Sequence, residues 1–372
     1  MFMAARCWPG AWRKFVQPFS DCRDRSQANS PRHSRPFRSY APTVMRSFND
    51  GVSEMLKEAR SRHLPVRDPG SVHFGDLVIE RARRLGHCFC LGLDPHLELV
   101  PSAFRTGSLD PSEPATIDAV EKFLCAVLDR AATRVAAVKP QSAHYERLGS
   151  AGIALLERIV VYARLLGVPV LLDAKRGDIS ATAQAYADAY LDPTGPNPVD
   201  ALTVNPYMGM DTMEPYFEKS RNHGCGVFVL VKTSNPGAGD FQDLDVAGVP
   251  LYARVAASLR GVCDELSGPG TGWSSIGLVA GTTYPRDAAR IRTLLPQALF
   301  LLPGYGYQSR DLSGIRAAFV RGPKTFEGGL VSSSRRTLFP EAGATSSLRN
   351  WEDAFSDQLS GDIGAVSDSL RL

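Results

Sequence analysis

Several features that would place this chain in a familiar class are missing from its sequence. No run of about 20 apolar residues occurs, and the longest candidate, residues 153–172, is broken by Glu157, Arg158 and Arg164. No GxGxxG turn follows an early strand-like segment, which argues against a doubly wound, dinucleotide-binding sheet. We therefore expect no membrane-spanning segment, and an open α/β sheet is only the alternative fold.

Cysteine and histidine are sparse, with seven of each in 372 residues. No CxxC pair and no HxxxH is present, and His96, His144 and His223 lack the spacing of metal ligands. The scattered cysteines indicate a reducing compartment without a disulfide framework. We expect no bound metal.

Acidic residues are scarce in one part of the chain only. The first 49 residues hold nine Lys and Arg and two Asp, so they carry +7, whereas the rest carries −4 of the net +3. An Arg-rich, acid-poor leader is typical of organelle transit peptides; a disordered tail, or a true start at Met45, are the alternatives. The body offers no basic surface for nucleic acid. We expect a location in the cytoplasm, or in an organelle stroma or matrix if the leader directs import.

Short apolar runs recur from residue 88 onward, and each is followed by a helical stretch. The runs are residues 88–93, 135–138, 168–172, 201–204, 227–231, 276–280, 299–302 and 330–332, and the helices are 115–132, 151–166, 181–191, 212–222, 249–266, 286–294 and 313–320. Eight buried strands alternating with helices predict a (β/α)8 TIM barrel. A helix over residues 72–86 precedes it and one from Asn350 to about Leu359 follows. We therefore expect an extension over 1–70, a barrel over 71–360 and a polar tail over 361–372.

The segment PVLLDAKRGDI, residues 169–179, carries the most information about chemistry. It places Asp173, Lys175 and Asp178 directly after an apolar run. Because side chains alternate along a strand, Asp173 and Lys175 are expected to point the same way. Desolvated charges rarely return net stability, so a catalytic purpose is the better explanation. Barrel enzymes build their sites at this end of the strands, where Asp94, Lys139 and other charged residues also follow apolar runs.

The motif LLDAKRGDISAT resembles the DxKxxDI signature of the orotidine 5′-phosphate decarboxylase family, in its second, bacterial-like branch. Further motifs of that family stand in order between residues 72 and 358: GLDP (92–95), VKPQSAHYE (138–146), VNPYMG (204–209), VLVKTSNPG (229–237), LPGYG (302–306) and SSSR (332–335). The resemblance implies decarboxylation of orotidine 5′-phosphate to UMP and CO2, without a cofactor, in a homodimer with shared active sites.

The resemblance also implies a role for each matching residue. Lys175 would stabilise the carbanion at C6 and protonate it, while Asp173, Asp178 and Lys139 hold its ammonium charged and oriented. The residues implied in substrate binding are Asp94 and Thr182 (ribose, Thr182 with Asp178 entering the second subunit's site), Ser234 and Pro303 (pyrimidine), Gln308 and Arg335 (phosphate), and Gln141. Tyr307, Ser309 and Arg310 depart from the glycine-rich sequence usual around that glutamine.

Two other functions fit parts of this pattern. A Mg²⁺-dependent phosphosugar decarboxylase or aldolase shares the DxKxxD motif, but Lys139 stands where those barrels place an acidic ligand. A non-catalytic nucleotide-binding barrel would lack one of the four charged residues implied in catalysis, and all four are present here: Lys139, Asp173, Lys175 and Asp178. The decarboxylase is the favoured hypothesis.

Overall fold

The computed structural model describes residues 72–372, except 106, 282–284, 306–311, 313 and 345–346. The chain divides into two units, Met1–Ser47 and Phe48–Leu372, and the described residues all belong to the second. The expected N-terminal extension, with its transit-peptide signal, lies outside the described residues, as does Gln308.

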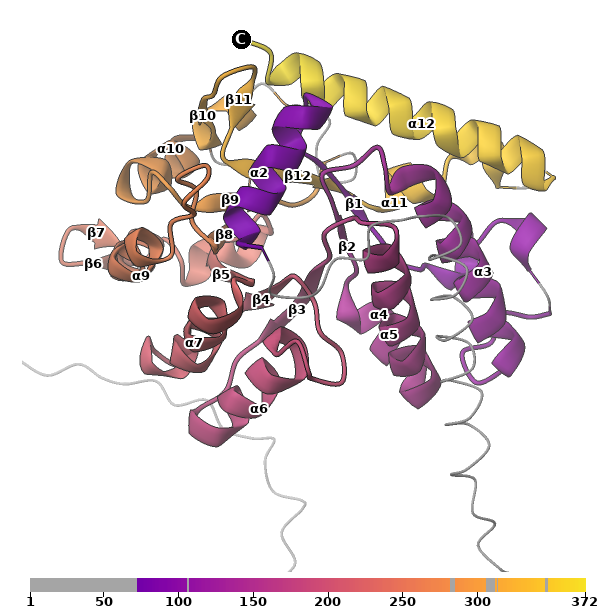
Figure 1. Ribbon diagram of the computed structural model, residues 1–372, viewed down its shortest axis with the longest axis horizontal. Helices are drawn as coiled ribbons and strands as arrows, with labels where there is room; N and C mark the ends of the chain where they lie inside the picture. Colours follow the sequence, from indigo (N-terminus) through magenta and orange to yellow (C-terminus); the bar gives the residue numbers. More distant parts are fainter. Residues whose placement is uncertain (1–71, 106, 282–284, 306–311, 313, 345–346) are drawn as a thin grey trace, which may run out of the picture. The chain divides into compact units, whose positions relative to one another are not determined.

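Eight parallel strands form one sheet, as the apolar runs predict (Figure 1). They are β1 (Phe89–Gly92), β2 (Ala137–Lys139), β3 (Leu171–Arg176), β4 (Ala201–Val204), β5 (Gly226–Lys232), β8 (Ile276–Ala280), β9 (Leu299–Leu302) and β12 (Gly329–Ser333), in the order β2-β1-β12-β9-β8-β5-β4-β3. Parallel bridges between Val138 and Val170 and between Gln141 and Asp173 join the two outer strands. The sheet is therefore closed, and the predicted (β/α)8 barrel is confirmed.

Helices surround the strands, and α2 crosses one end of the barrel (Figure 1). They are α2 (Phe74–Leu85), α3 (Pro114–Ala131), α4 (Ser142–Glu146), α5 (Gly149–Leu165), α6 (Ser180–Leu191), α7 (Glu214–His223), α8 (Leu251–Ser258), α9 (Arg260–Glu265), α10 (Pro285–Leu294), α11 (Arg335–Leu338) and α12 (Leu348–Ser369). Every residue of β1, β4, β8 and β9 is buried, because helices cover the outside and side chains fill the inside. Within the described part of the chain, no helix has the length and apolar character to cross a membrane.

Two predicted helices differ from the structure. The helix expected over 249–266 is divided at Leu259 into α8 and α9. The helix expected over 313–320 is instead a 3₁₀ turn, Ile315–Ala318, after which Phe319 is extended and the chain enters the hairpin of β10 (Val320–Arg321) and β11 (Phe326–Glu327). The Gly322-Pro323 turn that follows stops any helix at this point.

The expected polar tail over 361–372 is wrong, because α12 continues to Ser369. Its last three turns are anchored by Val366, which is buried, and by Asp362, whose carboxylate accepts hydrogen bonds from Arg336 Nε at 3.0 Å and Thr337 Oγ1 at 2.7 Å. Gly361 and Gly364 interrupt the helical spacing of apolar residues, so this part of the sequence does not predict a helix.

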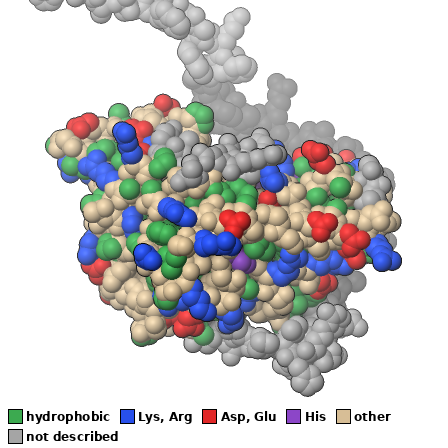
Figure 2. All heavy atoms as spheres, turned by 90° about the horizontal axis from the view of Figure 1, so that it is seen from above, with side chains coloured by type: hydrophobic (Ala, Val, Ile, Leu, Met, Phe, Trp, Pro, Cys, Tyr) green, Lys and Arg blue, Asp and Glu red, His purple; other side chains and the backbone are tan. Residues whose placement is uncertain are grey.

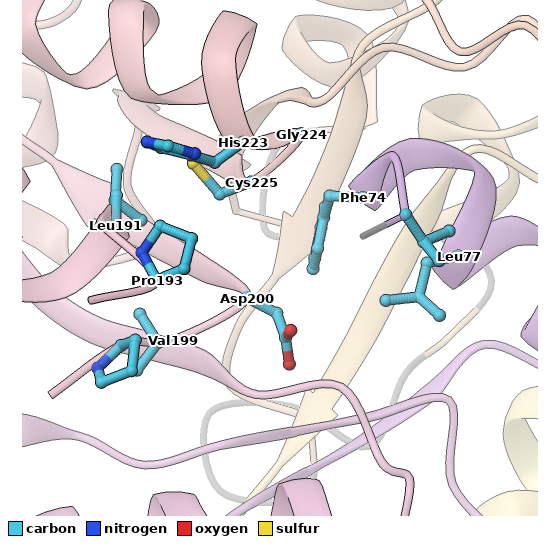
Figure 3. A pocket seen from close by; sticks show the side chains of 11 residues that line it. Phe74, Leu77, Leu191, Pro193, Val199, Asp200, His223, Gly224 and Cys225 are labelled. Atoms are coloured by element: carbon cyan, nitrogen blue, oxygen red, sulfur yellow. The ribbon is translucent and has the colours of Figure 1, made fainter. Parts of the chain in front are cut away.

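The end of the barrel under α2 is a packed structural end. Phe74 of α2 meets Phe228 of β5 edge to face, with ring centroids 5.8 Å apart. A cavity of about 10 Å³ lies at this end. Figure 3 shows the side chains of Phe74, Asp200 and Cys225 around it. The Asp200 carboxylate accepts a hydrogen bond from the backbone N of Val170 at 2.8 Å. Among the described residues, this cavity is too small to hold a substrate. On the face drawn in Figure 2, basic and acidic side chains are interspersed.

Candidate active site

The opposite end of the barrel holds a cavity of about 300 Å³ at the carboxyl ends of the strands. Its walls bring together residues from positions 94 to 335 of the chain: Asp94, His96, Lys139, Gln141, His144, Asp173, Pro303, Gly304, Tyr305, Ser332, Ser334 and Arg335. Six of these were predicted site residues, namely Asp94, Lys139, Gln141, Asp173, Pro303 and Arg335. The expectation that strand ends converge on one mouth is therefore confirmed for them.

Asp173 is the centre of a charged cluster in this mouth. Its Oδ1 accepts from Lys175 Nζ at 2.6 Å and its Oδ2 from Lys139 Nζ at 3.2 Å. Thr203 Oγ1, 2.9 Å from Oδ1, and Gln141 Nε2, 3.2 Å from Oδ2, complete its donors. With two donors on each oxygen, the carboxylate cannot rotate without losing hydrogen bonds, so it fixes both ammonium groups.

Electrostatics fix the protonation states of the buried pair. Burial by itself would raise the pKa of Asp173, but Lys139 and Lys175 beside it lower that pKa to about 2. Burial would likewise lower the pKa of Lys139, but Asp94 and Asp173 outweigh it and raise the pKa. At neutral pH Asp173 is therefore a carboxylate and Lys139 an ammonium ion.

The alternation of side chains along a regular strand does not explain the contact between Lys175 and Asp173, because the backbone of β3 is irregular here. The β3–β4 pairing shifts register between Leu172 and Arg176, and Lys175 has φ of 49° in the left-handed region. Its backbone N donates to Thr203 Oγ1 at 2.8 Å, which holds this conformation. A non-glycine residue pays about 1 kcal/mol there, and such strain concentrates at functional sites. With 41% of its side chain exposed, Lys175 is much more exposed than Asp173 and Lys139, at 11% and 7%.

Thr203 is a site residue that was not predicted from the sequence. It lies in the buried strand β4 and is fully buried, yet its hydroxyl links the Asp173 carboxylate to the Lys175 backbone. The available signal was a hydroxyl within the apolar run ALTV, since such a group needs a hydrogen-bond partner inside the protein.

Asp94 and Arg335 follow the neighbouring strands β1 and β12 and line the same cavity. Asp94 Oδ1 accepts from the backbone N of Gln141 at 3.1 Å, which ties the ends of β1 and β2 together. Arg335 begins α11 and donates from Nε to His96 Nε2 at 3.4 Å. A guanidinium and a carboxylate that line the same cavity suit a ligand with an anionic end and hydroxyl groups.

Ser234 lies at the rim between β5 and β8, outside the walls of this cavity. A Cβ added to Gly281 would lie 2.9 Å from Ser234 Cα, so only glycine allows this approach. The segment after β5 is anchored by Lys232, which is buried and paired with Asp243, and whose Nζ lies 3.9 Å from Asp287 Oδ2.

Asp178 and Thr182 do not join the charged cluster of their own chain. Asp178 Oδ1 accepts from the backbone N of Ile179 at 2.8 Å, and Thr182 is exposed in the first turn of α6. Among the described residues, no ion pair connects Asp178 with Lys175 or Lys139.

The active-site end of the barrel offers few side chains that could coordinate a metal ion. Within the described ranges, no group of three His, Cys, Asp or Glu side chains is arranged to hold a metal ion. The oxygens of Asp173 are already occupied by four hydrogen-bond donors, two of them cationic.

The fold and this mouth define a (β/α)8-barrel enzyme with a lysine–aspartate–lysine centre. A family model described as "Orotidine 5′-phosphate decarboxylase / HUMPS family" matches residues 88–323. The chain is 38% identical over 279 residues to the orotidine 5′-phosphate decarboxylase of Rhodopirellula baltica (73% of this chain, 91% of the relative). It is 40% identical over 294 residues to that of Deinococcus radiodurans (78% and 98%).

A solved structure agrees with the sequence relatives. Leishmania donovani OMP decarboxylase superposes with a TM-score of 0.58 at 32% identity, covering 80% of this chain and 99% of that one. The chain belongs to the orotidine 5′-phosphate decarboxylase / HUMPS family.

Proposed function

We propose that this protein converts orotidine 5′-phosphate to UMP and CO2, the last step of de novo UMP biosynthesis, without a cofactor. The observation that carries the proposal is Asp173 held between Lys139 and Lys175, at 3.2 and 2.6 Å, in the mouth of a barrel of this family. Incubation of the purified full-length chain with orotidine 5′-phosphate should yield UMP and CO2 in equal amounts. Turnover of a phosphosugar in its place would overturn the proposal.

The chemistry asks for a fixed positive charge next to the reacting carbon. When the bond from C6 to the carboxylate breaks, the electron pair stays on C6 and CO2 leaves. The ring offers no adjacent electron sink, so a preorganised cation must stabilise that charge. Lys175 supplies the cation and then transfers a proton from Nζ to C6, and solvent restores the proton. Asp173 and Lys139 hold the ammonium in place before the reaction, so little reorganisation is needed.

The remaining residues orient the nucleotide. Asp94 accepts hydrogen bonds from the ribose hydroxyls, and Gln141 lies beside it. Pro303 and Ser234 contact the pyrimidine. Arg335 and Gln308 bind the phosphate. Binding energy from this remote phosphate orients C6 against Lys175.

The functional unit in this proposal is a homodimer in which Asp178 and Thr182 complete the partner's site. Support comes from the surface around them, where large apolar side chains are exposed. These are Ile179 at 57%, Tyr207 at 85%, Met208 at 44% and Met210 at 36%. Such a cluster is unusual on a monomer and typical of an interface. No nucleic-acid or membrane partner is part of the proposal.

Subunit complementation tests the shared site. A heterodimer of one Lys175→Ala chain and one Asp178→Ala chain, purified through two different tags, keeps one intact site of two if Asp178 acts across the interface. It should show about half the wild-type rate, although each parent homodimer is inactive. A heterodimer of Lys175→Ala with Asp173→Asn is the matched control, because both changes affect a chain's own site, and it should stay inactive. Inactivity of both heterodimers would contradict the shared site.

Arg335→Ala should weaken binding and turnover together. Loss of charge-assisted hydrogen bonds to a phosphate dianion should lower kcat/KM by about 10²-fold or more and raise the Kd of UMP similarly, while uridine, which lacks the phosphate, binds as before. Steady-state kinetics and calorimetry measure these values, with the exposed Arg349→Ala as control. Equal weakening of UMP and uridine would contradict the assignment.

A further inference from the structure

His96 lines the active-site cavity and has no role in the proposed function. It follows β1, two residues after Asp94, and only 13% of its side chain is exposed. Both ring nitrogens have partners. Nε2 lies 3.4 Å from Arg335 Nε, and Nδ1 lies 3.4 Å from Glu98 Oε1.

These partners define the tautomer of the ring. The guanidinium of Arg335 can only donate, so Nε2 of His96 accepts and carries no proton. Nδ1 then carries the proton and donates to the Glu98 carboxylate, which increases the acceptor strength of Nε2. Burial, and then the positive charge of Arg335, lower the pKa of His96, which keeps the imidazole neutral at pH 7.

The ring itself is held from two sides. His144 of α4 packs edge to face on it, with centroids 4.5 Å apart, and Phe339 does so from 6.0 Å. The Nε2 lone pair therefore has a fixed direction in the cavity wall. Arg335, in contrast, has a long side chain with several rotatable bonds and stands in a helix of only four residues.

We propose that His96 is a positioning residue that holds the Arg335 guanidinium in the plane needed to bind the phosphate monoester of the nucleotide. Because the guanidinium is planar, fixing Nε through His96 also fixes the plane of the other N–H groups. The ligand does not need to touch His96. The inference rests on the proposed function, in which Arg335 is the phosphate-binding residue.

A pair of matched variants tests this proposal. His96→Gln keeps a neutral acceptor on an unbranched side chain, whereas His96→Met has nearly the same shape and only a weak sulfur acceptor. The Kd values of UMP and uridine are measured for both, with kcat and KM for orotidine 5′-phosphate. His223→Gln, at the opposite end of the barrel, is the control. Thermal unfolding of each variant reports on folding.

We expect His96→Met to raise the Kd of UMP, and the KM, by about tenfold, with kcat and uridine binding changed less than about twofold. His96→Gln should recover UMP binding to within about threefold of wild type. UMP binding by His96→Met at wild-type strength, equal weakening of UMP and uridine, or equal impairment of both variants would overturn the positioning role. Wild-type UMP affinity in Arg335→Ala would instead overturn the phosphate assignment itself.

Discussion

Replacement of Lys175 by alanine should lower kcat by at least about 10⁵-fold, equivalent to about 7 kcal/mol of transition-state stabilisation, and leave UMP binding measurable. In the proposed mechanism the Lys175 ammonium acts where charge develops at C6 and also supplies the proton, so both functions would disappear together. UMP already carries hydrogen at C6 and needs neither function. Single-turnover kinetics and calorimetry with UMP measure the two effects separately.

The fold should tolerate this change. Asp173 keeps Lys139, Thr203 and Gln141 as partners when Lys175 is removed. Lys122→Ala, which removes an exposed lysine of α3, is the control and should leave turnover unchanged. A kcat reduced less than about tenfold in Lys175→Ala would show that another group stabilises the carbanion.

Asp173→Asn should have the second largest effect and act on activity and stability together. An amide cannot hold two ammonium ions, so we expect kcat to fall by about 10⁴-fold. Lys139, of whose side chain 7% is exposed, would lose its nearest counter-charge, which costs about 3 kcal/mol in the free energy of unfolding. Kinetics and denaturant unfolding at pH 7 measure both.

The loss of folding stability at acidic pH should also depend on the Asp173 carboxylate. The pKa of Asp173 is lowered from 3.8 to about 2 in the folded state, so the unfolded chain binds the proton first as the pH falls. Its stabilisation is full above the unfolded pKa and is lost between about pH 4 and pH 2, by about 2 kcal/mol. Asp173→Asn should lack this component, whereas Asp353→Asn, at an exposed position of α12, should retain it. Parallel acid profiles for wild type and Asp173→Asn would contradict the ion-paired state.

Most strands could be predicted from the sequence because every residue of β1, β2, β4, β8, β9 and β12 is buried, so these strands coincide with apolar runs. The C-terminal part of α12 could not, since its buried anchor Asp362 is polar and two glycines interrupt the period. The segment after residue 313 has helix-compatible composition, but its pairing with Phe326 and Glu327 is a tertiary contact that local propensity does not contain.

The candidate site was predictable to the extent that barrel topology brings strand ends together. Asp94, Lys139, Asp173 and Arg335 are found around one cavity for that reason. The positive φ of Lys175 was not predictable, because it depends on a register shift and on the Thr203 hydroxyl from the next strand. The His96–Arg335 contact joins residues 239 positions apart, so no local pattern indicates it.

The rate of orotidine 5′-phosphate consumption after treatment with EDTA tests most directly whether a lysine ammonium alone stabilises the carbanion. The full-length protein and its Lys175→Ala variant are assayed side by side, before and after chelation and after addition of Mg²⁺. We predict that the wild-type rate is the same in all three conditions and that the variant is inactive in each. A wild-type rate that falls on chelation and returns with Mg²⁺ would contradict the mechanism.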